Sequence, residues 1–418
     1  MLKMWKLLLK GSLLITLLAC VSLQAADWPQ FRGLNRDGVA AETGLLKSWP
    51  ANGPKLLWSY EGLGAGWGSA AIVDNQVFVV GEIDKKETLF ALDATGSLKW
   101  KTTYSERWKR SFPDARTTPT IDLNSIYVNS GRGNVVCFDR TNGKIRWQVQ
   151  TVEEFDGEYH RWGIAESPLI VDNFVIATPG GKKASVVALD KATGKTIWIA
   201  SELTEKGNYC SPILVERGGK KIIVTMLENH FVGIDAPSGK VLWKDAFDDY
   251  FPHAKGINPV SPLYINGQIY TTSGYDDGGA LYDLSADGLS IKRVWVDSTL
   301  DVHHGGVVAL DGVIYGSNWQ GNRDGDWVAL DWKSGNVLYE HKWVNKGPII
   351  TADGLLYVYT EKEGKVGLVK PNKQKFDLVS SFSAPLGEGE HWAHPSISNG
   401  RLFIRHGDAL MVYDINLK

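Results

Sequence analysis

The segment Asp139-Arg-Thr-Asn-Gly143-Lys-Ile-Arg-Trp147 decides the fold, because its pattern Asp-x3-Gly-x3-Trp is repeated along the chain. Aspartate side chains bond back to the local backbone in turns, and glycine supplies the positive φ that other residues resist. Apolar runs flank each turn, so each copy predicts a hairpin closed by a large packing surface. The further copies, some with small changes in spacing or in the last residue, are Asp93, Gly96, Trp100; Asp190, Gly194, Trp198; Asp235, Gly239, Trp243; Asp283, Gly288, Trp295; and Asp331, Gly335, Tyr339.

A second element precedes each hairpin and consists of two apolar strands joined by a short turn. The segments 167–176 and 261–270 are examples. Eight such turns follow one another at intervals of about 45 residues, and no helical periodicity interrupts them. The sequence therefore predicts an all-β protein, a single eight-bladed β-propeller of four-stranded antiparallel blades.

The ring is expected to close through the N-terminus. The segment from His394 to Lys418 has room for three strands, whereas the run Leu56–Tyr60 resembles an outer strand without a blade of its own. Adding this run to the last blade hides two sheet edges. The predicted organisation is a signal peptide at 1–25, an N-terminal extension at 26–53 and the propeller at 54–418.

The first 25 residues resemble a secretory signal, with three lysines before an apolar stretch from Gly11 to Leu23. Cleavage after Ala25 predicts a periplasmic or secreted protein. The alternative is a lipobox ending at Cys20, which predicts a lipid anchor there. The apolar stretch is shorter than the roughly 20 residues that a spanning helix needs, so no transmembrane segment is expected. The 45 basic and 47 acidic residues nearly balance, which argues against a nucleic-acid partner.

Cys137 and Cys210 lie in apolar runs that belong to different blades. A disulfide requires Cα atoms within about 7 Å, so both thiols are expected to be buried and unpaired.

Segments such as Ala188-Leu-Asp-Lys-Ala-Thr-Gly-Lys-Thr-Ile-Trp198 resemble the tryptophan-docking repeats of quinoprotein-like propellers. The residues from Asp27 to Gly38 are similar to the start of exported members of this group. The resemblance covers roughly 54–418. It implies pyrroloquinoline quinone (PQQ) chemistry in the dehydrogenase branch and outer-membrane assembly in the BamB branch. The dehydrogenases carry an adjacent Cys-Cys pair that this chain lacks, so the resemblance does not support PQQ as the cofactor.

In a propeller, the residues leading into the first strand of each blade lie at one mouth of the channel, beside the loops between second and third strands. A concave mouth with aromatic and ionisable groups is the default binding-site hypothesis. The predicted ligand-binding residues are Trp67, Arg116, Arg161, Trp162, Tyr209, His303, His304, Trp319, His391, Trp392 and His394. The catalytic candidates, should the protein be an enzyme, are His304, His394, Glu166 and Arg116.

Each of these residues also has a purely structural interpretation. The tryptophans could pack blades together, and Arg116 and Glu166 could form one buried pair. Substituting Arg116 or His394 by alanine distinguishes the two interpretations. A binding role predicts lost binding at an almost unchanged melting temperature, whereas a structural role predicts early melting.

No metal site is predicted. The turns 275–279 and 322–326 contain aspartates but lack the later bidentate glutamate of calcium loops. His303 and His304 are neighbours, and neighbours on a strand point to opposite faces. The alternative is a zinc site formed by His304, His391 and His394.

The leading hypothesis is an exported propeller that binds a carbohydrate or another polar small molecule at the mouth. The first alternative is an enzyme on the same face, either a divergent quinoprotein oxidoreductase or a sugar-active lyase or hydrolase. The second alternative is an envelope scaffold of the outer-membrane assembly type, whose outer loops make the contacts.

Overall fold

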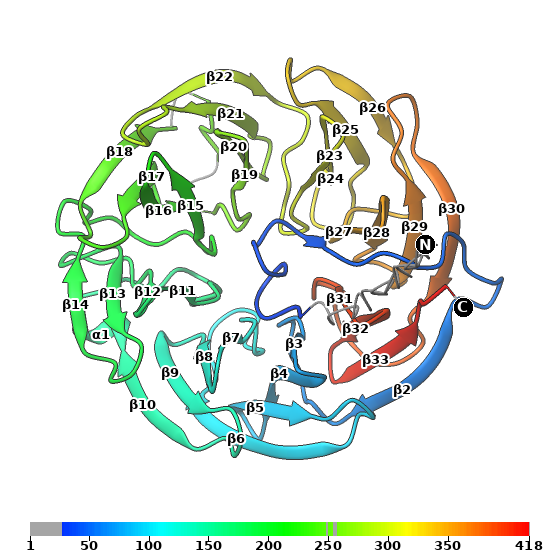
Figure 1. The fold of residues 1–418 in the computed structure, drawn as a ribbon, viewed down its shortest axis with the longest axis horizontal. Helices are drawn as coiled ribbons and strands as arrows, with labels where there is room; N and C mark the ends of the chain where they lie inside the picture. The colour runs from blue at the N-terminus through cyan, green and yellow to red at the C-terminus, as the bar shows by residue number, and fades with distance from the viewer. Residues whose placement is uncertain (1–26, 248–249, 254–256, 418) are drawn as a thin grey trace, which may run out of the picture.

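The computed structural model describes residues 27–247, 250–253 and 257–417. The predicted signal peptide and Cys20 lie outside these residues. The described strands form eight sheets arranged in a ring, seen down the channel in Figure 1. The protein is therefore the all-β, eight-bladed propeller that the repeats predict. No helix among the described residues has the length and apolar character needed to span a membrane.

Each blade is an antiparallel meander that runs from the channel outward. Blade 1 contains β3 (Ala71–Val73), β4 (Gln76–Ile83), β5 (Lys86–Leu92) and β6 (Leu98–Glu106), and blade 2 contains β7 (Thr120–Asp122), β8 (Ser125–Asn129), β9 (Asn134–Asp139) and β10 (Ile145–Gln150). Blade 3 contains β11 (Leu169–Val171), β12 (Phe174–Ala177), β13 (Val187–Asp190) and β14 (Thr196–Ile199), and blade 4 contains β15 (Ile213–Arg217), β16 (Lys220–Met226), β17 (His230–Asp235) and β18 (Val241–Ala246). A helical turn, α1 (Thr151–Glu154), follows β10.

Blades 5 to 8 repeat this plan, with one extra strand on blade 7 and an N-terminal strand in blade 8. Blade 5 contains β19 (Leu263–Ile265), β20 (Gln268–Ser273), β21 (Gly278–Leu284) and β22 (Ile291–Asp297), and blade 6 contains β23 (Val308–Leu310), β24 (Val313–Ser317), β25 (Trp327–Asp331) and β26 (Val337–His341). Blade 7 contains β1 (Val39–Ala40), β27 (Ile349–Ala352), β28 (Leu355–Tyr359), β29 (Lys365–Lys370) and β30 (Asp377–Ser383), and blade 8 contains β31 (Ser396–Ser398), β32 (Arg401–His406), β33 (Ala409–Asp414) and β2 (Lys55–Glu61).

The N-terminal strand closes the ring as expected. β2 pairs antiparallel with β33 in a register that places Leu56 opposite Tyr413 and Glu61 opposite Ala409. Blade 8 thereby gains its outer strand from the other end of the chain, and β2 covers the edge of β33 (Figure 1).

The repeated tryptophans join neighbouring blades. The indole of Trp147 covers Gly194, where an added Cβ would lie 2.7 Å from the ring. Its Nε1–H donates to the carbonyl of Lys191 at 3.1 Å. Trp58 of β2 makes the same contact with Gly96 and donates to Ala94, so ring closure uses the same docking device as the internal junctions.

The fourth junction departs from this pattern. Trp243 has a buried Nε1 without a hydrogen-bond partner. The stretched turn of blade 5 instead receives the guanidinium of Arg217, which donates to Ser285 at 3.2 Å. The altered spacing between Asp283 and Gly288 in the sequence marks this exception.

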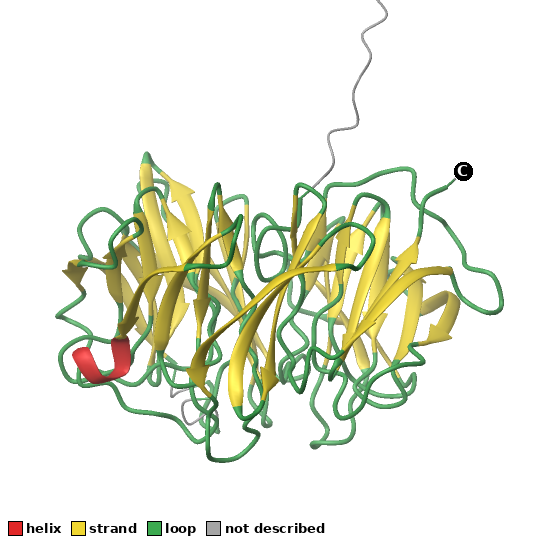
Figure 2. Cartoon of the chain, turned by 90° about the horizontal axis from the view of Figure 1, so that it is seen from below, coloured by secondary structure: helices red, strands yellow, loops and turns green. Residues whose placement is uncertain are grey.

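The N-terminal extension lies against the face that carries the turns between first and second strands. The carboxylate of Glu42 accepts hydrogen bonds from the backbone of Asn399 and Gly400 in the last of these turns. Figure 2 shows the C-terminus at this face and α1 at the opposite one. The opposite face is called the mouth face here.

Residues 28–38 of the extension, named the plug, fill the centre of the ring (Figure 1). Arg32 and Arg36 are each 2% exposed. Arg36 donates to the carbonyls of Ser167 and Pro212, at 3.0 and 2.9 Å. Arg32 donates to the carbonyl of Ile349, at 3.3 Å, on the other side of the channel. The plug therefore forms a floor beneath the mouth.

Candidate functional site at the channel mouth

The predicted mouth residues come from the connections that the fold places on the mouth face. Most of them precede the first strand of a blade, and Trp319 lies between the second and third strands of blade 6. Ring contacts and hydrogen bonds link most of them into three groups, while His391, His394 and Trp319 lie outside these groups. The structure therefore brings most of the predicted residues together, although it gives them different environments.

The first group is an aromatic cluster, named the platform, made of Trp67, Phe112 and Trp392. The ring centroids of Trp67 and Trp392 lie 4.8 Å apart, and that of Phe112 lies 5.9 Å from Trp67 and 5.4 Å from Trp392. Phe112 is 44% exposed, so the platform presents an apolar surface to solvent. Sequence reasoning missed Phe112, which lies four residues before the predicted Arg116 in the same connection.

Arg116 supports the platform from within. Its guanidinium lies 5.5 Å from the Trp67 ring and donates to the carbonyls of Phe112 and Trp162. Burial lowers the pKa of Arg116. Because its donors are directed at backbone carbonyls, Arg116 orders the walls of the site. Arg116 and Glu166 have other partners and do not form the buried pair that the structural interpretation suggested.

The second group contains Arg161, Trp162 and Tyr209. The backbone N–H of Trp162 donates to the Tyr209 hydroxyl at 3.3 Å, and the rings of the two residues are 5.7 Å apart. The exposed Arg161 guanidinium lies 5.6 Å from the Trp162 ring. Glu166 is 3% exposed and accepts a hydrogen bond from the backbone of Ala165 at 3.1 Å. Burial raises the pKa of Glu166 to about 7.

The third group, named the histidine cluster, contains His303, His304, Lys346 and Glu361. The two imidazole centroids are 4.1 Å apart, and Nδ1 of His304 lies 3.5 Å from Oε1 of Glu361. Lys346 Nζ lies 3.2 Å from Oε2 of Glu361. His304 also contacts the platform, with its ring 5.1 Å from that of Trp392.

The strand argument about the two histidines was wrong. His303 and His304 lie in a bend that ends before β23, so the alternation of a strand does not apply. Sequence reasoning also missed Glu361. Glu361 follows β28 and lies in the loop between the second and third strands of blade 7. Loops of this kind were expected at the mouth, and the same expectation that gave Trp319 would have found Glu361.

A rim of aromatic residues borders the histidine cluster. The Tyr275 hydroxyl is 3.0 Å from Nε2 of His303. The Tyr275 ring lies 5.1 Å from that of Trp319. Trp319 therefore reaches the site through Tyr275.

His394 belongs to the floor of the mouth. Its Nδ1 lies 3.2 Å from the Arg32 guanidinium and its Nε2 lies 2.8 Å from the His304 carbonyl. Arg32 can only donate, so Nδ1 is the acceptor and the imidazole is neutral. Burial lowers the pKa of His394 to about 3. With both ring nitrogens engaged, His394 is poorly placed to act as a base.

His391 turns away from the other histidines of the mouth. Its Nδ1 lies 2.6 Å from the Tyr359 hydroxyl, and its ring stacks on His406 at 3.6 Å. Since His391 and His394 have these other partners, the structure does not assemble the alternative zinc set with His304. Among the described residues, the three metal-ligating side chains that do converge are His303, His304 and Glu361.

A PQQ site does not fit the residues present. Cys137 and Cys210 are free and buried, one on β9 and the other just before β15. No adjacent thiol pair can therefore form. The floor of the mouth is occupied by the guanidinium of Arg32 and the imidazole of His394.

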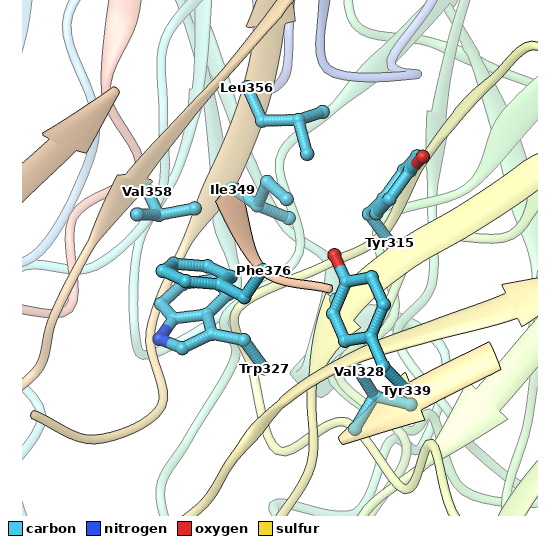
Figure 3. A pocket seen from close by; sticks show the side chains of 9 residues that line it. Tyr315, Trp327, Val328, Tyr339, Ile349, Leu356, Val358 and Phe376 are labelled. Atoms are coloured by element: carbon cyan, nitrogen blue, oxygen red, sulfur yellow. The ribbon is translucent and has the colours of Figure 1, made fainter. Parts of the chain in front are cut away.

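A small apolar cavity between blades 6 and 7 lies away from the mouth. Its volume is about 10 Å³, and its walls include Trp327, Tyr339 and Phe376 (Figure 3). This volume is about the least that one water molecule requires, and the lining offers little polar surface. The cavity is a packing gap between blades, too small for a ligand.

Comparisons with known proteins agree with the repeat and the blade count. The quinoprotein alcohol dehydrogenase PedH of Pseudomonas putida is 27% identical over 232 residues, which are 54% of this chain and 38% of PedH. The outer membrane protein assembly factor BamB of Kangiella koreensis is 23% identical over 213 residues, 50% of this chain and 48% of that protein. The matched part is thus less than half of each curated relative.

A solved structure extends the likeness over the whole fold. The crystal structure of BamB from Moraxella catarrhalis aligns with a TM-score of 0.63 and 15% identity, covering 86% of this chain and 99% of that one. The family described as outer membrane protein assembly factor BamB matches this chain over residues 42–156 and 105–340. Because this match spans more than half of the sequence, the chain belongs to the BamB-type, PQQ-like family of β-propellers.

Proposed function

We propose that this protein is an exported propeller that binds a carbohydrate or another polar small molecule at the mouth. One observation carries the proposal. The partly exposed platform of Trp67, Phe112 and Trp392 adjoins the ionisable histidine cluster through the contact between Trp392 and His304. An apolar ring surface beside convergent polar groups is the usual composition of a small-molecule site.

The chemistry of the platform favours a sugar. An aromatic face accepts the apolar C–H face of a pyranose ring, while nearby N–H and O–H groups bond the hydroxyls around its edge. The exposed guanidinium of Arg161 supplies positive charge at the mouth, which suits acidic sugars as well as neutral ones. The predicted signal peptide supports a periplasmic or secreted location, with an anchor at Cys20 as the alternative.

A thermal-shift screen of the purified protein tests the proposal. The ligands are neutral oligosaccharides, acidic sugars, and PQQ with calcium. A ligand that binds only the folded state raises the melting temperature by mass action, by an amount that grows with its concentration. We expect a shift with a sugar and none with PQQ and calcium.

The matched variants are Phe112→Ala and Leu123→Ala. Both residues are exposed, at 44 and 78%, but Leu123 lies in the turn between β7 and β8 on the opposite face. We expect F112A to need at least ten times more sugar than the wild type for the same rise in melting temperature. L123A should give the same rise as the wild type at each sugar concentration. Equal shifts in both variants, or no shift with any sugar, would contradict binding at the platform.

An assembly scaffold is the second candidate, favoured by the family match over residues 42–340. A scaffold makes its contacts through outer loops and does not need the mouth. The cellular phenotype of a deletion strain should then be restored equally by the wild type and by a variant carrying F112A and His303→Ala. Failure of that variant, at normal protein level, argues for the mouth.

A further inference from the structure

His303, His304 and Glu361 bring three metal-ligating side chains to one point beside the platform. One ligand atom of each lies within 4.8 Å of the other two. They come from different parts of the ring. The two histidines precede β23 of blade 6, and Glu361 follows β28 of blade 7. A compact group of this kind, built from distant segments, needs a physical reason to exist.

Each of the three side chains has one buried polar atom that lacks a hydrogen-bond partner. His303 Nδ1, His304 Nε2 and Glu361 Oε1 are all buried and unsatisfied. A buried polar atom without a partner costs about 1–3 kcal/mol, so native proteins rarely keep several together. A bound ion would satisfy such atoms at once, because each offers a lone pair.

The neighbours of the group hold it in a suitable state. The Tyr275 hydroxyl engages Nε2 of His303, and Lys346 engages Oε2 of Glu361, which leaves one free ligand atom on each. Such outer contacts orient ligands in known metal sites.

We infer that His303, His304 and Glu361 form a binding site for a divalent first-row transition metal ion, with zinc(II) as the best match. Two imidazoles and one carboxylate are a preferred ligand set for zinc, whereas calcium and magnesium favour oxygen ligands alone. Three protein ligands leave a fourth coordination position.

The site requires only small movements to close on an ion. Tetrahedral zinc with bonds of about 2.0–2.1 Å holds its ligands roughly 3.4 Å apart. The present separations of up to 4.8 Å exceed this by an amount that rotation of the side chains can supply. Both histidines are partly accessible, so the ion could enter from solvent.

Binding of Zn²⁺ and Co²⁺ to the purified protein tests this inference. The protein should carry no histidine tag and should first be treated with a chelator. We expect one equivalent of Zn²⁺ to bind, with a rise in melting temperature, and Co²⁺ to give the visible absorption of a four-coordinate ion. Ca²⁺ at the same concentration should give neither signal.

His303→Ala and His304→Ala each remove a ligand, and Glu361→Gln replaces a carboxylate ligand by a neutral amide, so each should weaken Zn²⁺ binding roughly 100-fold. His230→Ala is the matched control. Its imidazole also pairs with a glutamate, Nδ1 lying 2.8 Å from Glu205, but this pair belongs to blade 4 and lies outside the histidine cluster. Circular dichroism identifies variants that fail to fold. E361Q keeps the shape of its side chain, so at least this variant should remain folded.

Two outcomes would overturn the inference. One is that the wild type binds Zn²⁺ no more tightly than E361Q. The other is that H230A weakens binding as much as the ligand variants do. The inference stands apart from sugar binding, because F112A should retain full Zn²⁺ affinity even where it loses the sugar response.

Discussion

At the scale of the residue, burial separates the side chains that build the mouth from those that can act in it. Arg116 and His394 have their donors and acceptors committed to the protein, whereas Phe112 and Arg161 are exposed. The structure therefore favours the structural interpretation for Arg116 and His394. Their alanine variants are expected to melt early, and binding tests belong on the exposed residues.

The pH dependence of folding stability tests whether Glu166 is buried as the structure shows. Its pKa is raised by burial from 4.5 to about 7 in the folded protein, so the folded state binds a proton that the unfolded state has already released. Folding stability contributed by this group is therefore lost as pH rises from about 4.5 to about 7. Glu166→Gln removes the titration while keeping an acceptor for Ala165.

We expect the stability of E166Q relative to the wild type to increase between pH 5 and pH 8, by up to roughly 3 kcal/mol. Urea denaturation at both pH values measures this difference. The exposed Glu61→Gln on β2 is the control, and it should show no such trend. A parallel pH profile for E166Q and the wild type would mean that Glu166 is solvated in the folded protein.

At the scale of the element, the hairpin pattern was sufficient to predict the blades because its physics is local. Asp139, Gly143 and Trp147 carry the turn, the positive φ and the packing surface within nine residues. The closing strand could be predicted because the last blade lacked one. Phe112 was missed because its partners Trp67 and Trp392 come from other blades, and no local spacing announces such contacts. Glu361 lies in a loop whose position on the mouth face could be predicted, but the sequence does not show its contact with His304.

Glycine has two roles in the turns of the blades: it adopts a positive φ, and in some turns it leaves room for the tryptophan ring of the neighbouring blade. Gly194 and Gly354 have the same positive φ of 75°, but an added Cβ at Gly194 would lie 2.7 Å from the Trp147 ring, whereas Gly354 has open space. Both alanine variants should lose the roughly 1 kcal/mol of a strained backbone. Gly194→Ala should lose about 1–3 kcal/mol more, because the ring must move. Equal denaturation midpoints for the two variants would show that docking adds nothing.

At the scale of the whole molecule, the plug connects blades on opposite sides of the channel. Arg36 reaches Thr120, Ser167 and Pro212 in blades 2, 3 and 4. Arg32 reaches Val307, Ile349 and His394 in blades 6, 7 and 8. The sequence did not predict this role, since residues 26–53 lie outside the repeat and a buried arginine has no periodic signature.

Arg36→Met tests whether the plug stabilises the ring as a unit. The change leaves the buried carbonyls of Ser167, Pro168 and Pro212 without their donor, and each unsatisfied carbonyl costs about 1–3 kcal/mol. We expect a loss of at least about 3 kcal/mol in a single transition by tryptophan fluorescence. Arg140→Met, which breaks an exposed pair with Asp74, should cost less than about 1 kcal/mol. If R36M unfolded in two separate steps, the two halves of the ring would be independent, and the plug would serve as a cover for the channel without holding the blades together.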